Sequence, residues 1–247
     1  MMNAPDFSPI ALQYARTRPA YPDALFTELA SIAPGRRLAW DCATGNGQAA
    51  LGLAAHFDRV VATDISAEQI AHAAAHPRVE YIVAGAERSP LAGRSADIIT
   101  AASAAHWFDL DAFFSEVRRV LRPGGVLAVW TYHVGRMEPP FDDLFRRFYD
   151  GHLSPYFAPG ARLVDAEYRT LTPPGEAVET GPHRVSASWN LDQMFGFIRS
   201  WSGTQEYIRD RGSDPSGIIA AELESIWGPR SRVRTVRWPL SIRVTRL

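Results

Sequence analysis

Apolar residues follow two different periods between residues 36 and 130. Short apolar runs typical of buried strands alternate with stretches in which apolar residues recur every three or four positions, as on one face of a helix. The runs predict strands at Leu38–Cys42, Val60–Thr63, Val79–Val83, Ile98–Ala101 and Val126–Trp130. The helical stretches lie at Gln48–His56, Ala67–Ala75 and Leu110–Leu121. This alternation predicts an α/β fold with a mostly parallel, doubly wound sheet and helices on both faces.

Helix-ending residues support several of these boundaries. Ser66 and Gln69, three positions apart, are a capping pair for the second helix, and Pro77 follows its end. The sequence Arg122-Pro123-Gly124-Gly125 should stop the third helix and turn the chain into the fifth strand.

The regularity is weaker on both sides of this core. An arm at Tyr14–Pro22 and a helix at Asp23–Ile32 precede it. After Tyr132, helices are predicted at Phe141–Gly151, Leu191–Ser200, Thr204–Arg211 and Ile218–Trp227, and extended chain at Val178–Trp189 and Val233–Val244. Much of this region is aromatic, which predicts a helical cap over a ligand cleft. We expect one domain: arm and helix at 1–35, cofactor-binding core at 36–132, cap with a late strand at 133–230, and final strand at 231–247.

A glycine turn follows the first predicted strand. Leu38–Ala50 reads LAWDCATGNGQAA, and the second strand ends in Asp64, 19 residues after Gly45. Glycines at positions 45 and 47 let a backbone approach a ligand closely, and a carboxylate at the neighbouring strand end accepts both ribose hydroxyls. The spacing therefore predicts a site for a nucleoside cofactor.

The turn alone does not choose the cofactor. Gly45 to Ala50 also fits the G-x-G-x-x-A pattern of nicotinamide-binding proteins. Asp41 favours S-adenosylmethionine, because its carboxylate would meet the positive methionine end directly or through water, whereas it would repel a pyrophosphate. A nicotinamide-dependent oxidoreductase and a non-catalytic cofactor-binding protein stay open as alternatives.

Several segments together resemble a known family. The motifs are Y-x-x-x-R-P-x-Y-P at Tyr14–Pro22, D-x-x-T-G-x-G-Q at Asp41–Gln48, T-D-I-S at Thr63–Ser66, A-x-H-W-F-D at Ala104–Asp109 and E-V-R-R-V-L-R-P-G-G at Glu116–Gly125. With them the chain resembles the class I S-adenosylmethionine-dependent methyltransferases. It looks most like the type 11 branch, which includes trans-aconitate methyltransferase-like proteins.

The resemblance implies a Rossmann-like, seven-stranded sheet whose last strand, Val233–Val244, runs antiparallel. It implies S-adenosyl-L-methionine as cofactor, with S-adenosyl-L-homocysteine as product. The implied cofactor contacts are Tyr14, Arg18, Asp41, Ala43, Gly45, Asn46, Gly47, Asp64, Ile65, Gln69, Ala86, Glu87 and Ser103.

This chain departs from the family pattern at two of these places. The family often has glycine where Ala43 stands, so we expect a negative φ there. The acid common after the third strand aligns with Gly85, which leaves Glu87 or a backbone group for the adenine amine.

Methyl transfer is an in-line displacement on an activated carbon, so positioning and exclusion of water matter more than a catalytic triad. His106 and Trp107 follow the fourth strand, where α/β folds place ligand contacts. His106 is the candidate acceptor-binding group or general base, although a loop histidine bonded to backbone fits the pattern equally well. Trp107, Tyr132, His133 and Trp201 are candidate substrate contacts, with packing as the alternative. We expect a small-molecule acceptor, methylated at a carboxylate or hydroxyl oxygen.

Composition excludes several other classes of protein. The 247 residues are 46% hydrophobic and carry a formal net charge of −1, so no general attraction to nucleic acid or anionic membrane is expected. All 26 basic residues are arginine. Those at Arg230, Arg232, Arg234, Arg237, Arg243 and Arg246 fit one solvated strand face better than a nucleic-acid surface.

Neither targeting nor metal binding is indicated. The N-terminus carries no signal-peptide pattern and no apolar run is long enough to span a bilayer, which predicts a cytoplasmic protein. The single cysteine, Cys42, excludes an intrachain disulfide. His72 and His76 lie four apart but lack a third ligand, so no metal site is expected.

Overall fold

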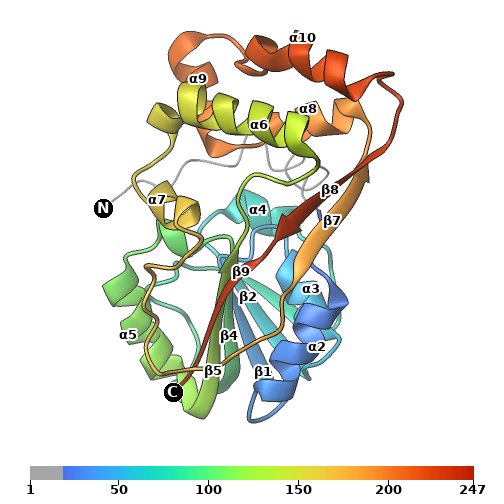
Figure 1. Cartoon of the computed structure of the whole chain (residues 1–247). Coiled ribbons are helices and arrows are strands. Elements are labelled where there is room, and N and C mark those ends of the chain that lie inside the picture. Colours follow the sequence, from blue (N-terminus) through green and yellow to red (C-terminus); the bar gives the residue numbers. More distant parts are fainter. Residues whose placement is uncertain (1–18) are drawn as a thin grey trace.

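A seven-stranded sheet, in the order β3-β2-β1-β4-β5-β9-β6, forms the lower half of the molecule (Figure 1). The structure is a computed structural model that describes residues 19–247. The strands are β1 (Leu38–Cys42), β2 (Arg59–Asp64), β3 (Val79–Val83), β4 (Ala96–Ala102), β5 (Leu121–Thr131), β6 (Glu176–Ala177) and β9 (Ser241–Arg246). Neighbours among β1 to β5 pair in parallel, whereas β9 pairs antiparallel with β5 and β6. The predicted fold class is confirmed.

Helices cover both faces of this sheet because successive strand residues point to opposite sides. Ala39 of β1 packs in a core with α2 (Asp23–Ile32) and α3 (Gln48–Ala54). The next residue, Trp40, packs in a second core with α5 (Leu110–Val120). Figure 1 shows α5 on one side of the sheet and α2 and α3 on the other.

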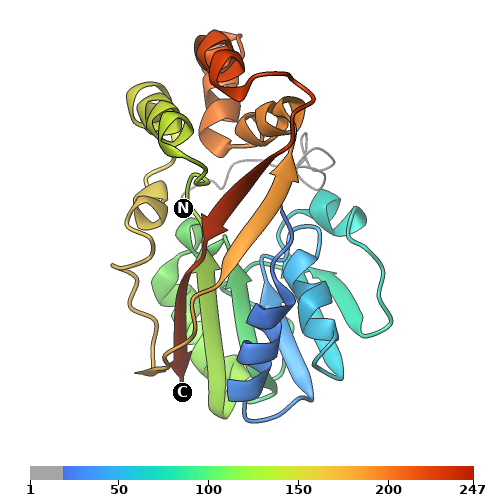
Figure 2. The same ribbon diagram turned by 45° about the vertical axis from the view of Figure 1, so that its right-hand side comes forward.

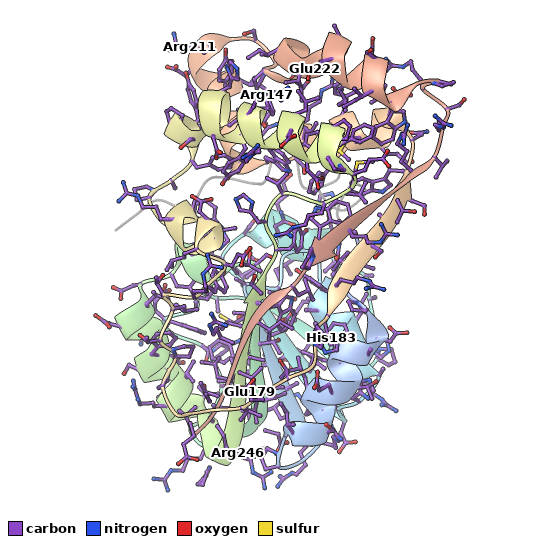
Figure 3. The ribbon with its side chains drawn as sticks, in the orientation of Figure 1. Arg147, Glu179, His183, Arg211, Glu222 and Arg246 are labelled. Atoms are coloured by element: carbon purple, nitrogen blue, oxygen red, sulfur yellow. The ribbon has the colours of Figure 1, made fainter. Side chains whose placement is uncertain are left out.

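A helical cap lies above the carboxyl ends of the strands (Figure 1). Its elements are α6 (Pro139–Phe148), the π-helix η3 (Tyr149–Leu153), the 3₁₀-helix η4 (Ser154–Tyr156), α7 (Ala161–Asp165), α8 (Leu191–Arg199), α9 (Ser202–Arg211) and α10 (Ser216–Trp227). The cap has its own aromatic core, which includes Phe141, Phe148 and Trp227. Arg147 and Glu222, labelled in Figure 3, join α6 to α10 at 2.6 Å. The helix predicted at Phe141–Gly151 is α-helical as far as Phe148 and continues as the π-helix η3 from Tyr149.

A two-stranded ribbon connects the cap with the sheet (Figure 2). It pairs β7 (Arg184–Trp189) antiparallel with β8 (Arg234–Pro239). The prediction of one strand at Val233–Val244 is therefore wrong, since that run divides into β8 and β9. The division falls at Pro239, which has no amide hydrogen to donate to a ladder. The segment before β7 is held to α2 by His183, whose Nε2 lies 2.5 Å from Oε2 of Glu28 (Figure 3).

The helix predicted at Ala67–Ala75 is shorter in the structure. α4 covers only Ala67–Ala71, and its N-cap Ser66 accepts a hydrogen bond from the Gln69 amide at 3.2 Å, as predicted. His72 and the next alanines are mostly exposed, so a longer helix would bury no apolar face there. None of the helices in residues 19–247 has both the length and the apolar character needed to cross a membrane.

Candidate functional site

The turn after β1 is open on one side. Gly45 has φ +57° and Gly47 has φ +89°, values that favour glycine. A Cβ at Gly45 would meet only Oε1 of Gln69, at 3.9 Å, whereas a Cβ at Gly47 would collide with the Tyr81 hydroxyl. That oxygen of Gln69 is buried and has no hydrogen-bond partner among the described residues. The turn thus leaves space for a ligand, with an unpaired acceptor beside it.

Asp64 faces this turn from the end of β2. Its Oδ2 accepts from the Gly45 amide at 2.8 Å, and its Oδ1 accepts from the Ser66 amide at 2.9 Å. Burial raises the pKa of the carboxyl, and these amide hydrogen bonds oppose that shift. The Ile65 amide is a third donor to this carboxylate. Since a carboxylate has about four acceptor positions, one stays open to a hydroxyl group of a ligand.

Asp41 lies beneath the turn and is fully buried. Its carboxylate accepts from the hydroxyls of Thr44, at 2.5 Å, and Thr100, at 2.7 Å, and from the backbone amide of Ala50 in α3. Burial raises its pKa to about 6, against the effect of these hydrogen bonds. Protein groups surround both oxygens, and an interaction of Asp41 with a ligand, directly or through water, stays a prediction.

Two residues at the strand ends have backbone strain. Ala43, after β1, has φ +52°, so the expected negative φ is wrong. Ser103, after β4, also has φ +52°. The neighbouring amides fix these conformations: Thr44 N–H donates to Thr63 O at 2.9 Å, and Ser103 N–H donates to Trp130 O at 2.7 Å. Such strain in non-glycine residues often accompanies ligand sites.

Apolar side chains are exposed on the far side of the turn. Ile65, after β2, is 74% exposed and Val83, at the end of β3, is 52% exposed. Both would suit the face of an aromatic ring. Nearby, Ala86 is buried, and Glu87 is exposed and accepts from the Asp109 amide at 3.2 Å. Asn46 is half-buried within the turn, while the predicted contacts Tyr14 and Arg18 lie outside the described residues.

A pocket of about 710 Å³, including its open mouth, lies between the sheet and the cap. Its lining residues are Ser103, His106, Trp107, Thr131, Tyr132, His133, Val134, Tyr149, Phe157, Ala161, Val164, Phe197, Trp201 and Ser202. The structure thus brings together all the predicted candidates for catalysis and acceptor binding. Ser103 belongs both to this lining and to the strand ends that surround the glycine turn.

The two histidines of the pocket have different partners. His106, in the 3₁₀-helix η2 (Ala105–Trp107), has its Nδ1 2.9 Å from the hydroxyl of buried Tyr168. Burial raises the pKa of Tyr168, which keeps that hydroxyl protonated. His133, just after β5, has its Nε2 3.0 Å from Oδ1 of Asp165, which also accepts from the Tyr149 hydroxyl at 2.8 Å.

The sequence did not single out Asp165, Tyr149 or Tyr168 for the pocket. They lie in the cap region and in the loop after it, where no motif fixes a distance to the strands. The aromatic content of the cap was the only signal. Tyr149 and Phe197 pack in the cap core and also line the pocket.

Several C-terminal arginines are structural. Arg234 donates to Glu138 at 2.6 Å and lies over the Phe141 ring, and Arg243 donates to Tyr168 O at 3.1 Å. Arg246, labelled in Figure 3, donates to Ile32 O at 2.8 Å. The interpretation of one solvated strand face is therefore too simple. None of the described residues that line the pocket is an arginine.

The other residues considered from sequence lie away from this pocket. Cys42 is buried, and burial raises the pKa of its thiol, so it is not a reactive nucleophile. His72 Nδ1 lies 2.8 Å from Glu68 O, and His76 Nδ1 accepts from the Arg78 amide at 3.2 Å. Across residues 19–247, no three His, Cys, Asp or Glu side chains cluster as a metal site would require.

Comparisons with known proteins find similarity to methyltransferases. Residues 40–129 match a family described as methyltransferase domain. A Dictyostelium discoideum protein described as a methyltransferase is 33% identical, over 84% of this chain and 81% of its own length. A Saccharomyces cerevisiae protein described as an S-adenosylmethionine-dependent methyltransferase is 24% identical, over 86% of each chain.

One solved structure is more similar still. It is described as a type II methyltransferase from Anaeromyxobacter dehalogenans, with 44% identity, a TM-score of 0.85 and coverage of 93% of this chain and 97% of that one. None of these three descriptions names trans-aconitate, so that narrower resemblance stays a prediction.

Proposed function

The chain belongs to the methyltransferase domain family and is an S-adenosylmethionine-dependent methyltransferase, and from that premise we propose that it methylates an oxygen of a small molecule. The acceptor would bind in the pocket beneath the cap. The observation that carries the proposal is the position of Ser103, which follows β4, the neighbour of β1 in the sheet, and also lines the aromatic pocket. A donor held at the turn and an acceptor held in the pocket would meet there.

The residues around the turn fit the cofactor. Gly45 leaves room for it, and Asp64 retains acceptor capacity for a ribose hydroxyl. Ile65 and Val83 offer exposed apolar surface to the adenine ring. Gln69 offers an unpaired amide oxygen beside the turn. Asp41 adds negative charge beneath the site, which favours a cationic donor over a pyrophosphate.

When bound, S-adenosylmethionine supplies a methyl group that is already activated as a sulfonium. The chain's own residues then have to bind and orient the acceptor and exclude water. The rings of Trp107, Tyr132, Phe157 and Trp201 would exclude water, because they form much of the lining. The two histidines, His106 and His133, could orient an acceptor oxygen there.

Calorimetry with matched variants tests the cofactor site. Asp64→Ala should weaken S-adenosylmethionine binding about 10- to 100-fold, because hydrogen bonds to a charged group contribute about 1.5–3 kcal/mol. Asp58→Ala is the control, since Asp58 is an exposed acid immediately before the same strand. It should change binding less than about two-fold. Equal binding by the wild type and Asp64→Ala would remove the assigned ribose contact.

Turnover separates an enzyme from a binding protein of the same fold. Release of S-adenosylhomocysteine with a panel of phenols, alcohols and carboxylic acids would show that an acceptor is methylated. Cofactor binding without release for any oxygen acceptor would contradict the proposed reaction. The nicotinamide alternative is not retained, because family membership already selects methyl transfer.

A further inference from the structure

We propose that His133 is the general base of the reaction, that Asp165 and Tyr149 position it, and that the acceptor is a neutral, ring-bearing hydroxyl compound. This inference rests on the proposed function, since it assigns roles within the same pocket. It differs from the expectation from sequence, which placed the base at His106.

The hydrogen bonds of His133 define where its ring hydrogen lies. Nε2 lies 3.0 Å from Oδ1 of Asp165, and a carboxylate can only accept. In a neutral imidazole the hydrogen is therefore on Nε2, and Nδ1 carries the lone pair. Within residues 19–247, Nδ1 forms no hydrogen bond. His133 thus offers an unprotonated nitrogen, and its ring lines the pocket.

Asp165 is itself held in place. Its Oδ1 accepts from the Tyr149 hydroxyl at 2.8 Å, and the Tyr149 ring meets the His133 ring edge to face, with centroids 4.7 Å apart. Burial and the adjacent Asp165 raise the pKa of Tyr149, so the hydroxyl remains a donor. Asp165 lies in α7, Tyr149 lies in η3, and His133 lies just after β5. Three separate elements therefore fix the orientation of this base.

The Nδ1 of His106 lies 2.9 Å from the neutral hydroxyl of Tyr168. Asp165, in contrast, places a negative charge next to His133 and would stabilise its protonated ring. Among residues 19–247, the charged or titratable groups that face His133 and Asp165 are Tyr149 and, through its field on Tyr149, Asp150.

The lining of the pocket indicates the class of acceptor. The side chains that residues 19–247 contribute to it are aromatic, aliphatic or small and polar, apart from the two histidines, and none of them is an arginine or an acid. A carboxylate bound among these groups would lose its hydration without a dedicated cation. A neutral aromatic alcohol would bury its ring against Trp107, Phe157 or Trp201 and present only its hydroxyl to His133. The hydroxyl of such an acceptor has to lose its proton during methyl transfer, so the reaction needs a general base.

In the proposed step, proton transfer to His133 accompanies methyl transfer. His133 Nδ1 takes the hydroxyl proton as an electron pair of the acceptor oxygen forms the new bond to the methyl carbon. The carbon–sulfur bond breaks and its electron pair stays on sulfur, which yields the neutral thioether. The positive charge thus moves from the sulfonium to the imidazolium, where Asp165 stabilises it until solvent takes the proton.

Substituted phenols test this assignment, with Asp165→Asn as the main variant. For phenol and 4-methoxyphenol, Asp165→Asn should lower kcat about ten-fold with little change in KM, and His133→Asn about 100-fold. For 4-nitrophenol, which is largely ionised near neutral pH, both losses should be less than about two-fold. Asp165→Glu should restore much of the rate. Asp143→Asn, at an exposed acid paired with Arg146 on α6, is the matched control and should leave every rate unchanged.

A measurement without turnover uses the histidine itself. In NMR spectra, the ring nitrogen signals of His133 should show the hydrogen on Nε2, and Asp165→Asn should shift the Nε2 signal more than Tyr149→Phe does, because Asp165 accepts that hydrogen bond. Equal losses for all phenols, or an unchanged Nε2 signal, would overturn the assignment of the base. Failure of the wild type to methylate any phenol would overturn the acceptor class, and turnover of benzoate would then leave the proposed function intact. Absence of S-adenosylmethionine binding would instead contradict the proposed function.

Discussion

Replacing Asp41 with asparagine removes a charge that the fold buries at the end of β1. The carboxyl has a pKa of about 6 in the folded protein, against 3.8 for an ordinary aspartate. A folded-state pKa above the unfolded value means that the native state holds the proton more tightly. Its favourable contribution is complete below about pH 4 and is lost as the pH rises through about 6. At neutral pH the charged Asp41 therefore destabilises the fold.

The size of this effect follows from the shift. At about 1.4 kcal/mol per pKa unit, a rise from 3.8 to about 6 corresponds to about 3 kcal/mol. Asp41→Asn should thus gain up to about 3 kcal/mol in free energy of unfolding over the wild type between about pH 4 and pH 8. Urea titrations at a series of pH values measure the difference, in which contributions of the other groups cancel. Asp58→Asn, at an exposed acid, should show no such trend.

Ligand binding should change in the opposite direction. The lost charge lies beneath the turn, so Asp41→Asn should weaken binding of cationic S-adenosylmethionine about ten-fold, or about 1.4 kcal/mol. S-adenosylhomocysteine has no sulfonium and should be affected less. A stability difference that is constant across pH would refute the buried-charge reasoning. Equal weakening of both ligands would refute the electrostatic role.

Three further substitutions test other parts of the structure. Ala43→Gly should raise the free energy of unfolding by up to about 1 kcal/mol in thermal unfolding, because glycine relieves the strain at φ +52°. Glu116→Gln should cost up to about 3 kcal/mol at neutral pH, since Arg119 and Ser89 hold the Glu116 pKa near 2. This stabilisation is lost as the pH falls from about 4.5 towards 2, so in urea titrations the two proteins should converge there. Gly160→Ala should raise the acceptor KM about ten-fold in steady-state assays, because its Cβ would overlap the carbonyl of His106 and displace α7; calorimetry should show unchanged cofactor binding.

Much of the sheet was predictable because local sequence determines it. The predicted β1 and β3 have the observed bounds, and so has α2. Strands buried on both faces must be apolar throughout, which leaves a clear pattern. The last strand was predicted wrongly because its residues alternate equally well on both sides of Pro239. The sheet that each half joins depends on its partner strand. β9 pairs with β5, more than 100 residues earlier in the chain, and β8 pairs with β7.

The two halves of the candidate site were unequally predictable. The glycine turn and Asp64 are close in sequence and come from adjacent strands, so their spacing carries the information. The pocket needs Tyr149 and Asp165 from cap elements, whose approach to His133 depends on packing between segments with no fixed distance. The sequence could therefore indicate His133 as a candidate, but it could not show that the carboxylate of Asp165 lies beside it.

The positions where simple rules fail are concentrated at the carboxyl ends of β1 and β4. Ala43 and Ser103 adopt a backbone conformation that disfavours side chains, and Asp41 keeps a carboxyl in the core. Each feature lowers the stability of the folded chain, and no described contact requires a carboxylate at Asp41 in place of an asparagine amide. A fold selected for stability alone would not combine them within one turn. Their common location is explained if the turn is shaped for a cationic ligand. Two measurements on Asp41→Asn test that explanation: the pH dependence of its stability difference from the wild type, and its relative affinity for S-adenosylmethionine and S-adenosylhomocysteine.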